Sequence, residues 1–180
     1  GVPIGTAINR HGVPTVEIDP STAAGQQSGA ELLSTADILI ENTRPGSSAE
    51  ESLAVKQIHA DHPSLVILSI SDFGRDTSYR GWQATTPVLH ALTSELSRSG
   101  IPGRAPLVPP SADLPYHVAA SQAAFFTLSV FLDRLRTGTG DLIDFSLLEG
   151  AMQTLDPPFG TAGSAAVGVP ISEQKRDWIA

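Results

Sequence analysis

The sequence contains no cysteine, few basic residues and no apolar run of membrane-spanning length. The lack of cysteine excludes disulfide bonds, thiolate zinc sites and cysteine nucleophiles, and we expect a reducing cytoplasm as its compartment. Only 11 Lys and Arg stand against 19 Asp and Glu, a net charge of −8, which argues against nucleic acid or an anionic membrane as a partner. No motif predicts a metal site. The longest apolar stretch, residues 118–132, is too short to span a bilayer, so we expect a buried helix.

What is present fits one globular domain of ordinary size. The 180 residues are 41% hydrophobic, enough to build a core. The chain opens without methionine, and its last residues, 177–180, show no natural ending. We therefore expect a fragment of a longer polypeptide.

Predicted strands and helices alternate along the chain. Strands are expected at 15–19, 37–41, 65–70 and 141–145, and helices at 29–34, 49–59, 86–98, 117–136 and 146–154. The run 65–70 is continuous and rich in β-branched residues, which is typical of a strand buried on both faces of a parallel sheet. Ser146, with Glu149 three residues later, fits a capping box for the last helix. The pattern predicts an α/β fold with a Rossmann-like parallel sheet flanked by helices, which binds ligands beyond the carboxyl ends of its strands.

Four segments, in this order, resemble family III CoA-transferases of the CaiB/BaiF type. They are 36–46 (ADILIENTRPG), 65–74 (LVILSISDFG), 89–103 with its helix and Ser-Gly-Ile-Pro-Gly, and 136–149, which contains RTGTG and DFSLLE. The resemblance spans about residues 36–155 and implies that family's large-domain core. Residues 1–35 match poorly, and 156–180 form a Gly- and Ala-rich tail or linker.

The resemblance implies transfer of coenzyme A between an acyl-CoA thioester and a carboxylic acid. A carboxylate nucleophile would pass through an acyl anhydride and an enzyme-bound CoA thioester, which splits one difficult exchange into two easier steps. CoA is then a substrate, and no prosthetic group is expected. The family also implies an interlocked homodimer, while a tandem or heteromeric partner is the alternative. The acyl group stays open.

Two loops correspond to the family's CoA-binding segments. Their predicted ligand contacts are Asn42, Thr43, Arg44, Ser71, Asp72, Phe73 and Gly74. A guanidinium and backbone donors at a strand end suit the phosphates of CoA, and a glycine permits close approach of the backbone. The alternative interpretation is a solvent-exposed turn at Arg44 and a turn-capping carboxylate at Asp72.

The catalytic carboxylate is assigned to Asp113. The family's usual spacing back from Gly138 reaches Tyr116, which is not an acid, and Asp113 lies three residues earlier. It is the nucleophile if the loop or helix here is three residues longer, and a solvated loop residue otherwise. Asp113 is the only acid between 100 and 131.

Two other functions compete with CoA transfer. A non-catalytic CoA-transferase-like domain, serving assembly or ligand binding, is suggested by the shifted Asp113, the missing amino-terminal motif and Glu50, where members often carry a basic residue. An acyl-CoA racemase is disfavoured, because threonine in the segment 84–87 occupies the place of that branch's histidine.

Overall fold

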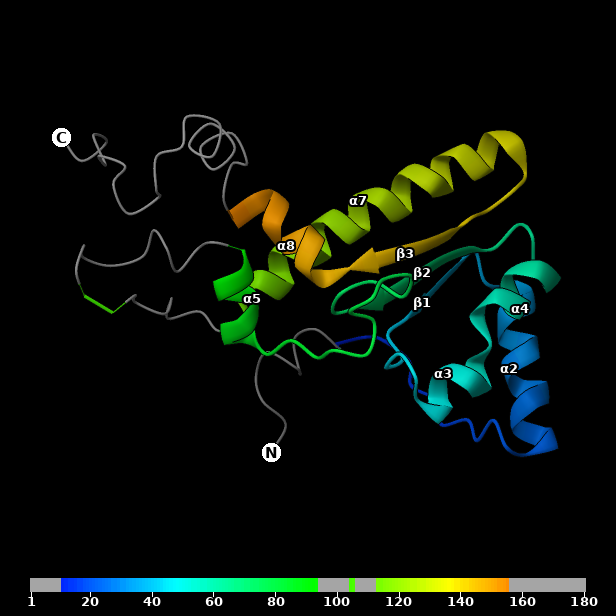
Figure 1. The fold of residues 1–180 in the computed structure, drawn as a ribbon. Helices are drawn as coiled ribbons and strands as arrows, with labels where there is room; N and C mark the ends of the chain where they lie inside the picture. The colour runs from blue at the N-terminus through cyan, green and yellow to red at the C-terminus, as the bar shows by residue number, and fades with distance from the viewer. Residues whose placement is uncertain (1–10, 94–103, 106–112, 156–180) are drawn as a thin grey trace. The chain divides into compact units, whose positions relative to one another are not determined.

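The computed structural model describes residues 11–93, 104–105 and 113–155 (Figure 1). The chain divides into two compact units, 1–35 and 36–180. In the first unit, the described residues form one helix, α2 (Ala23–Thr35), none of whose residues is buried. The predicted helix 29–34 is its second half.

The strand predicted at 15–19 is wrong. No described strand pairs with this segment, so nothing satisfies its backbone as a sheet would. The chain turns instead into α2, where the backbone N–H of Thr22 donates to the Asp19 carbonyl at 3.2 Å. The Thr22 hydroxyl then accepts a hydrogen bond from the Gly25 N–H, which satisfies one of the free donors at the start of a helix.

The second unit is built on three parallel strands, which confirms the predicted α/β class. They are β1 (Ile38–Glu41), β2 (Val66–Ser71) and β3 (Leu142–Ser146), in the order β1-β2-β3. β2 is almost wholly buried between its neighbours, as its apolar run predicts. Figure 1 shows α7 along one side of the sheet and α3 and α4 on the other.

The connections are helical, with bounds that differ from prediction at several points. The helices are α3 (Ser48–Leu53), α4 (Val55–Asp61), α5 (Thr86–Leu92), α7 (Leu114–Thr137) and α8 (Leu147–Leu155). The single helix predicted at 49–59 is two, because Ala54 adopts a left-handed conformation with φ 48° that ends the first. Residues 94–98 of the helix predicted at 86–98 lie outside the described residues. The cap predicted at Ser146 is confirmed, since its hydroxyl accepts from the Glu149 N–H at 3.3 Å.

Helix α7 packs one narrow face on the sheet. Ala119 and Ala123, with Leu68 and Phe145, form a buried core, and the two alanines let the helix lie close to the strands. The opposite face carries an exposed apolar stripe at helical spacing: Phe125, Leu128, Leu132 and Leu135. Most of α7 is therefore exposed, which corrects the expectation of a buried helix at 118–132.

α7 also has the length and composition of a membrane span. Its mean hydropathy is 1.2 over an 18-residue window, of which 17% is buried, and it alone among the helices of the described residues meets that test. The sequence-based estimate of its apolar length was too short. One such helix is weak evidence for a membrane span, because the test uses length and composition only.

Candidate functional site

Three polar side chains form a row across the sheet near the carboxyl ends of its strands. The register places Glu41 beside Ser69, and Ser69 beside Asp144. In a strand, alternate residues share a face, and Leu68 and Phe145, the neighbours of Ser69 and Asp144, face α7. The row therefore lies on the opposite face. Glu41 is buried there, so its carboxylate requires a cation.

Arg75 supplies that cation from the loop after β2. Its Nη2 lies 2.8 Å from Oε1 of Glu41 and its Nη1 lies 2.7 Å from Oε1 of Glu50. Its Nε donates to the Ser69 hydroxyl, which itself donates to Glu41. The side chains of Arg75 and Glu41 are only 15% and 4% exposed, so these are largely desolvated charges held by good geometry.

The backbone of the same loop contacts β3. The Arg75 N–H donates to both carboxylate oxygens of Asp144, at 3.0 and 2.9 Å, and the Asp76 N–H donates to one of them at 3.2 Å. Asp144 thus accepts hydrogen bonds from the start of the loop. Through Glu41, Ser69 and Asp144, the loop after β2 is therefore fixed to all three strands.

Glu50, at α3, connects the cluster to solvent. Its Oε2 accepts from the Gly46 N–H at 2.6 Å and lies 3.3 Å from Nη2 of Arg80, whose side chain is exposed. The Gly46 hydrogen bond is the main cause that lowers the pKa of Glu50, and Arg75 and Arg80 act in the same direction, while burial opposes them. Glu50 is therefore held as a carboxylate within the cluster.

The predicted residues Asn42, Thr43 and Arg44 follow β1 directly. Thr43 donates to Oε2 of Glu41 through both its N–H, at 2.8 Å, and its hydroxyl, at 2.7 Å. Asn42 and Arg44 are exposed. With the amide of Gln83 oriented to satisfy its neighbours, its oxygen accepts from Nε of Arg44 at 3.0 Å. Two side chains of this loop thus remain available to a ligand.

The predicted residues Ser71 to Gly74 lie at the end of the adjacent strand. The Asp72 carboxylate accepts from the Ala84 N–H at 2.8 Å, which closes the loop 72–84, so the turn-capping interpretation describes its contact. Gly74 has φ 84°, a conformation that favours glycine. Phe73 packs its ring edge-on against Trp82. The hydroxyl of Ser71 is buried and has no partner among the described residues.

Asp113 begins α7. The helix ends at Thr137 and leads through a short turn to the start of β3, so it runs antiparallel to the strands and its first residues point toward their carboxyl ends (Figure 1). The Asp113 side chain is exposed and makes no capping hydrogen bond. No hydrogen bond or ion pair among the described residues joins Asp113 to the two loops, although all three lie toward the same edge of the sheet.

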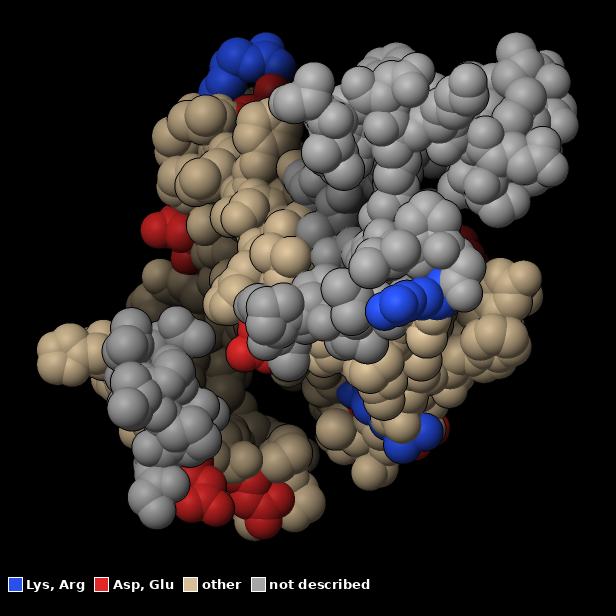
Figure 2. All heavy atoms as spheres, turned by 90° about the vertical axis from the view of Figure 1, so that its left-hand side faces the viewer, with Lys and Arg blue, Asp and Glu red and all other residues tan. Residues whose placement is uncertain are grey.

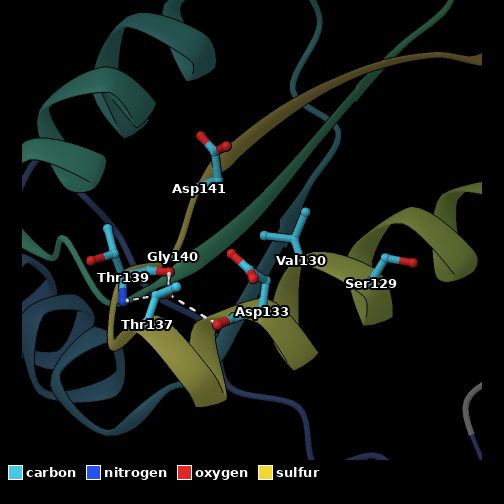
Figure 3. Close-up of a pocket in the computed structure, with 7 residues that line it drawn as sticks. All are labelled: Ser129, Val130, Asp133, Thr137, Thr139, Gly140 and Asp141. Atoms are coloured by element: carbon cyan, nitrogen blue, oxygen red, sulfur yellow. Dashed lines mark hydrogen bonds between the residues drawn. The ribbon is translucent and has the colours of Figure 1, made fainter.

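The larger of two pockets among the described residues lies at the other edge. Its volume is about 460 Å³, and it is lined by Ser129, Val130, Asp133, Thr137, Thr139, Gly140 and Asp141. Figure 3 shows these residues on the last turns of α7 and in the turn that leads to β3, with the Thr137 hydroxyl bonded to the backbone of Asp133 and Thr139. This hollow contains none of the residues predicted for the site.

Charge is sparse among the described residues on one face of the molecule. Figure 2 shows mostly uncharged described atoms there, with acidic and basic side chains in small separate groups. Among the described residues, no group of three or more His, Cys, Asp or Glu could hold a metal ion.

Sequence reasoning missed Arg75, Ser69 and Asp144. Ser69 was counted within the continuous apolar run 65–70, and Arg75 was assigned no role. One signal was available in the sequence: a buried acid at the end of a strand needs a basic neighbour. Which polar residues of the three strands share a row could not be predicted, because that depends on the register of the sheet.

The family model of CoA-transferase family III matches residues 6–179, and the chain belongs to this family. It is 36% identical over 169 residues to a probable CoA-transferase of Mycobacterium tuberculosis, covering 94% of this chain and 21% of that protein. It is 32% identical over 152 residues to the succinyl-CoA–L-malate CoA-transferase alpha subunit of Chloroflexus aurantiacus, covering 83% and 36%. The chain therefore spans well under half the length of these relatives.

Solved structures show the same fold. A CaiB/BaiF family protein from Brucella suis superposes with a TM-score of 0.74 at 24% identity, over 85% of this chain and 40% of that one. A second protein of Mycobacterium tuberculosis, in an orthorhombic crystal form, gives 0.69 at 20% identity, over 85% and 42%. At these identities the likeness establishes the fold.

Proposed function

We propose that the polypeptide transfers coenzyme A between an acyl-CoA thioester and a carboxylic acid, with Asp113 as the nucleophile. One observation carries the assignment to Asp113: its carboxylate is exposed and uncapped at the start of a helix that points toward the carboxyl edge of the sheet. Ligands of open α/β sheets bind at that edge. Relatives named CoA-transferases support the reaction class.

The chemistry needs no cofactor. An oxygen of the Asp113 carboxylate bonds to the thioester carbonyl carbon, the carbon–sulfur bond breaks, and the CoA thiolate leaves. The thiolate then attacks the aspartyl carbonyl carbon of the anhydride and releases the first acid as its carboxylate. The carboxylate of the second acid attacks the carbonyl carbon of this aspartyl thioester, the carbon–sulfur bond breaks, and a second anhydride forms. The released CoA thiolate attacks the acyl carbonyl carbon of that anhydride, which gives the new acyl-CoA and frees the Asp113 carboxylate. No electron or proton is left over.

The two loops would hold the CoA moiety. Arg44 is exposed, and the described partner of its side chain is the neutral amide of Gln83, so it could exchange that partner for a phosphate. Asn42 is exposed beside it. Ser71 offers a buried hydroxyl without a partner among the described residues, at the end of the adjacent strand. These are the contacts that we assign to CoA, while Thr43, Asp72 and Gly74 shape the loops and Phe73 supports Trp82.

The test is to trap the intermediate in the complete polypeptide. After incubation with acyl-CoA and hydroxylamine, mass spectrometry should find the hydroxamate on the peptide that contains Asp113. Asp113→Asn should lose transfer activity at least a thousandfold, in order of magnitude, as nucleophile removal does. Asp133→Asn, on the same helix but near its other end, is the matched control and should keep activity. Full activity in Asp113→Asn would contradict the assignment.

A non-catalytic role is favoured by one feature. Glu41 and Glu50 place two carboxylates among the loops where CoA phosphates would bind, which weakens attraction for an anion. The Chloroflexus relatives include proteins named alpha and beta subunits, which is consistent with a partner chain in this alternative. Calorimetry decides: a complete polypeptide that does not bind CoA supports the assembly role and contradicts CoA transfer.

A further inference from the structure

Arg44, Arg75 and Arg80 lie at the carboxyl edge of the sheet, and they differ in how many of their N–H donors bond to acceptors of the protein. Nε of Arg75 bonds Ser69, Nη1 bonds Glu50, and Nη2 bonds Glu41 and the Thr43 carbonyl, the last at 2.7 Å. Every nitrogen of this guanidinium has an acceptor within the protein. Arg44 and Arg80, in contrast, are exposed. Of the three, Arg75 is thus the arginine whose nitrogens are all engaged by the protein, while Arg44 and Arg80 are the more open to a phosphate.

What Arg75 holds is the loop after β1. The Thr43 carbonyl accepts from Arg75, while the Thr43 N–H and hydroxyl donate to Glu41, which is itself paired with Arg75. The carbonyl, the N–H and the hydroxyl of Thr43 are therefore all bonded to the buried ion pair of Arg75 and Glu41. The next peptide unit carries Arg44, so the direction in which Arg44 leaves the loop depends on this contact.

Arg75 also sets the local charge. Without it, Glu41 and Glu50 would leave two carboxylates beside the loop, one of them almost fully buried. Lysine could restore the charge but not the planar fork, which reaches Ser69, Glu50 and Glu41 in different directions. Geometry and charge can therefore be separated by substitution.

We propose that Arg75 is a positioning residue for CoA binding, which orients the loop 42–46 through the Thr43 carbonyl without touching CoA. The inference rests on the proposed function, because it takes this loop as part of the CoA site. It assigns a role to the best-connected side chain of the cluster, and it predicts that affinity for CoA depends on the shape of the Arg75 side chain as well as on its charge.

The experiment compares three variants of the complete polypeptide. CoA affinity is measured by calorimetry for Arg75→Lys, Arg75→Gln and the control Arg134→Gln. Arg134 is similarly buried, 18% exposed, and forms one ion pair with Asp37 at 2.7 Å, near the start of β1. Both Arg75 variants should bind CoA about tenfold more weakly, equivalent to about 1.4 kcal/mol, whereas Arg134→Gln should bind normally. In transfer assays the KM for acyl-CoA should rise with kcat little changed.

Hydrogen exchange supplies a readout that does not need CoA. In Arg75→Lys, the amides of residues 42–44 and 46 should exchange faster, while those of β2 keep their protection. Wild-type protein that fails to bind CoA contradicts the proposed function. Unchanged exchange in Arg75→Lys overturns the positioning role whatever CoA does.

Two further results would also overturn it. Arg75→Lys could bind CoA as well as wild type, in which case charge alone matters. Arg134→Gln could lose as much affinity, in which case general stability is the cause. If neither Arg75 variant folds, Arg75 serves the whole fold and the specific role is rejected.

Discussion

The two edges of the sheet are built by different means. At the carboxyl edge, Arg75 gathers Glu41, Glu50 and Ser69 into one buried polar network. At the amino edge, the described residues show a partly exposed pair of Arg134 with Asp37, beside an open pocket of about 460 Å³. The larger hollow and the denser polar network therefore lie at opposite ends. In this molecule the network, and not the hollow, coincides with the segments that resemble CoA-binding loops.

Close backbone packing holds the amino edge. The Gly140 N–H donates to the Pro63 carbonyl at 2.9 Å, and a side-chain carbon added to Gly140 would lie 2.2 Å from the Leu65 carbonyl oxygen. That approach is open to glycine alone. One edge thus depends on charge and the other on steric fit, and three predictions test the contrast.

The largest loss of stability is expected at the charge network. Glu41→Ala removes the acceptor of Thr43 and Ser69 and leaves Arg75 without one of its two carboxylates, so we expect a loss of about 3–5 kcal/mol. Urea unfolding of the chain measures it. Asp37→Ala, which breaks the exposed pair with Arg134 at the other edge, should cost only about 0–1 kcal/mol. Equal losses for the two would erase the difference between the edges.

A smaller loss is expected from filling the amino edge. Gly140→Ala forces a methyl group against the backbone of Leu65, and we expect about 1–3 kcal/mol from the strain that follows. Thermal and urea unfolding give the value. Gly81→Ala is the control, since nothing lies within 4 Å of its added carbon, and it should change stability by less than about 1 kcal/mol. A neutral Gly140→Ala would show that the turn has room to move.

The smallest effect concerns pH. The pKa of Glu50 is lowered in the folded state, chiefly by the Gly46 N–H, so its contribution is complete above the ordinary value of 4.5 and is lost as pH falls through the folded pKa. Wild type should therefore exceed Glu50→Gln in stability at neutral pH, and the difference should shrink in acid. Denaturant unfolding from pH 7 to pH 3 measures it. A difference in stability that stays constant across this pH range would contradict a lowered pKa of Glu50 in the folded state.

The sequence predicted the parallel sheet well, because the apolar run of β2 admits few other structures. It also predicted the Ser146 cap, which depends on local spacing. It failed where the answer lies in distant contacts: the left-handed Ala54 that divides one helix into two, and the exposed outer face of α7. Arg75 was missed for the same reason, since its partners come together only in the register of the sheet.

The predictions about the site residues differ from those about the fold, because ligand contacts were not tested. The structure places the two predicted loops at neighbouring strand ends, and their contact with CoA stays a prediction. Asp113 also stays a prediction, because a count along the chain cannot replace a measured distance to a bound thioester. The contacts of Thr43 and Asp72 are with the protein itself, which a sequence motif cannot reveal, since ligand contact and loop bracing use the same residue types.

The spacing of Arg75's partners along the chain bears on the order of folding. Its contacts with Glu50 and Thr43 join residues 25 and 32 positions apart, whereas its contact with Asp144 spans 69. Shorter loops close sooner, and a growing polypeptide leaves the ribosome from its amino terminus. The ion cluster would therefore assemble on β1 and β2 while β3 is still being synthesised, and β3 would dock last, onto a site already shaped to receive Asp144.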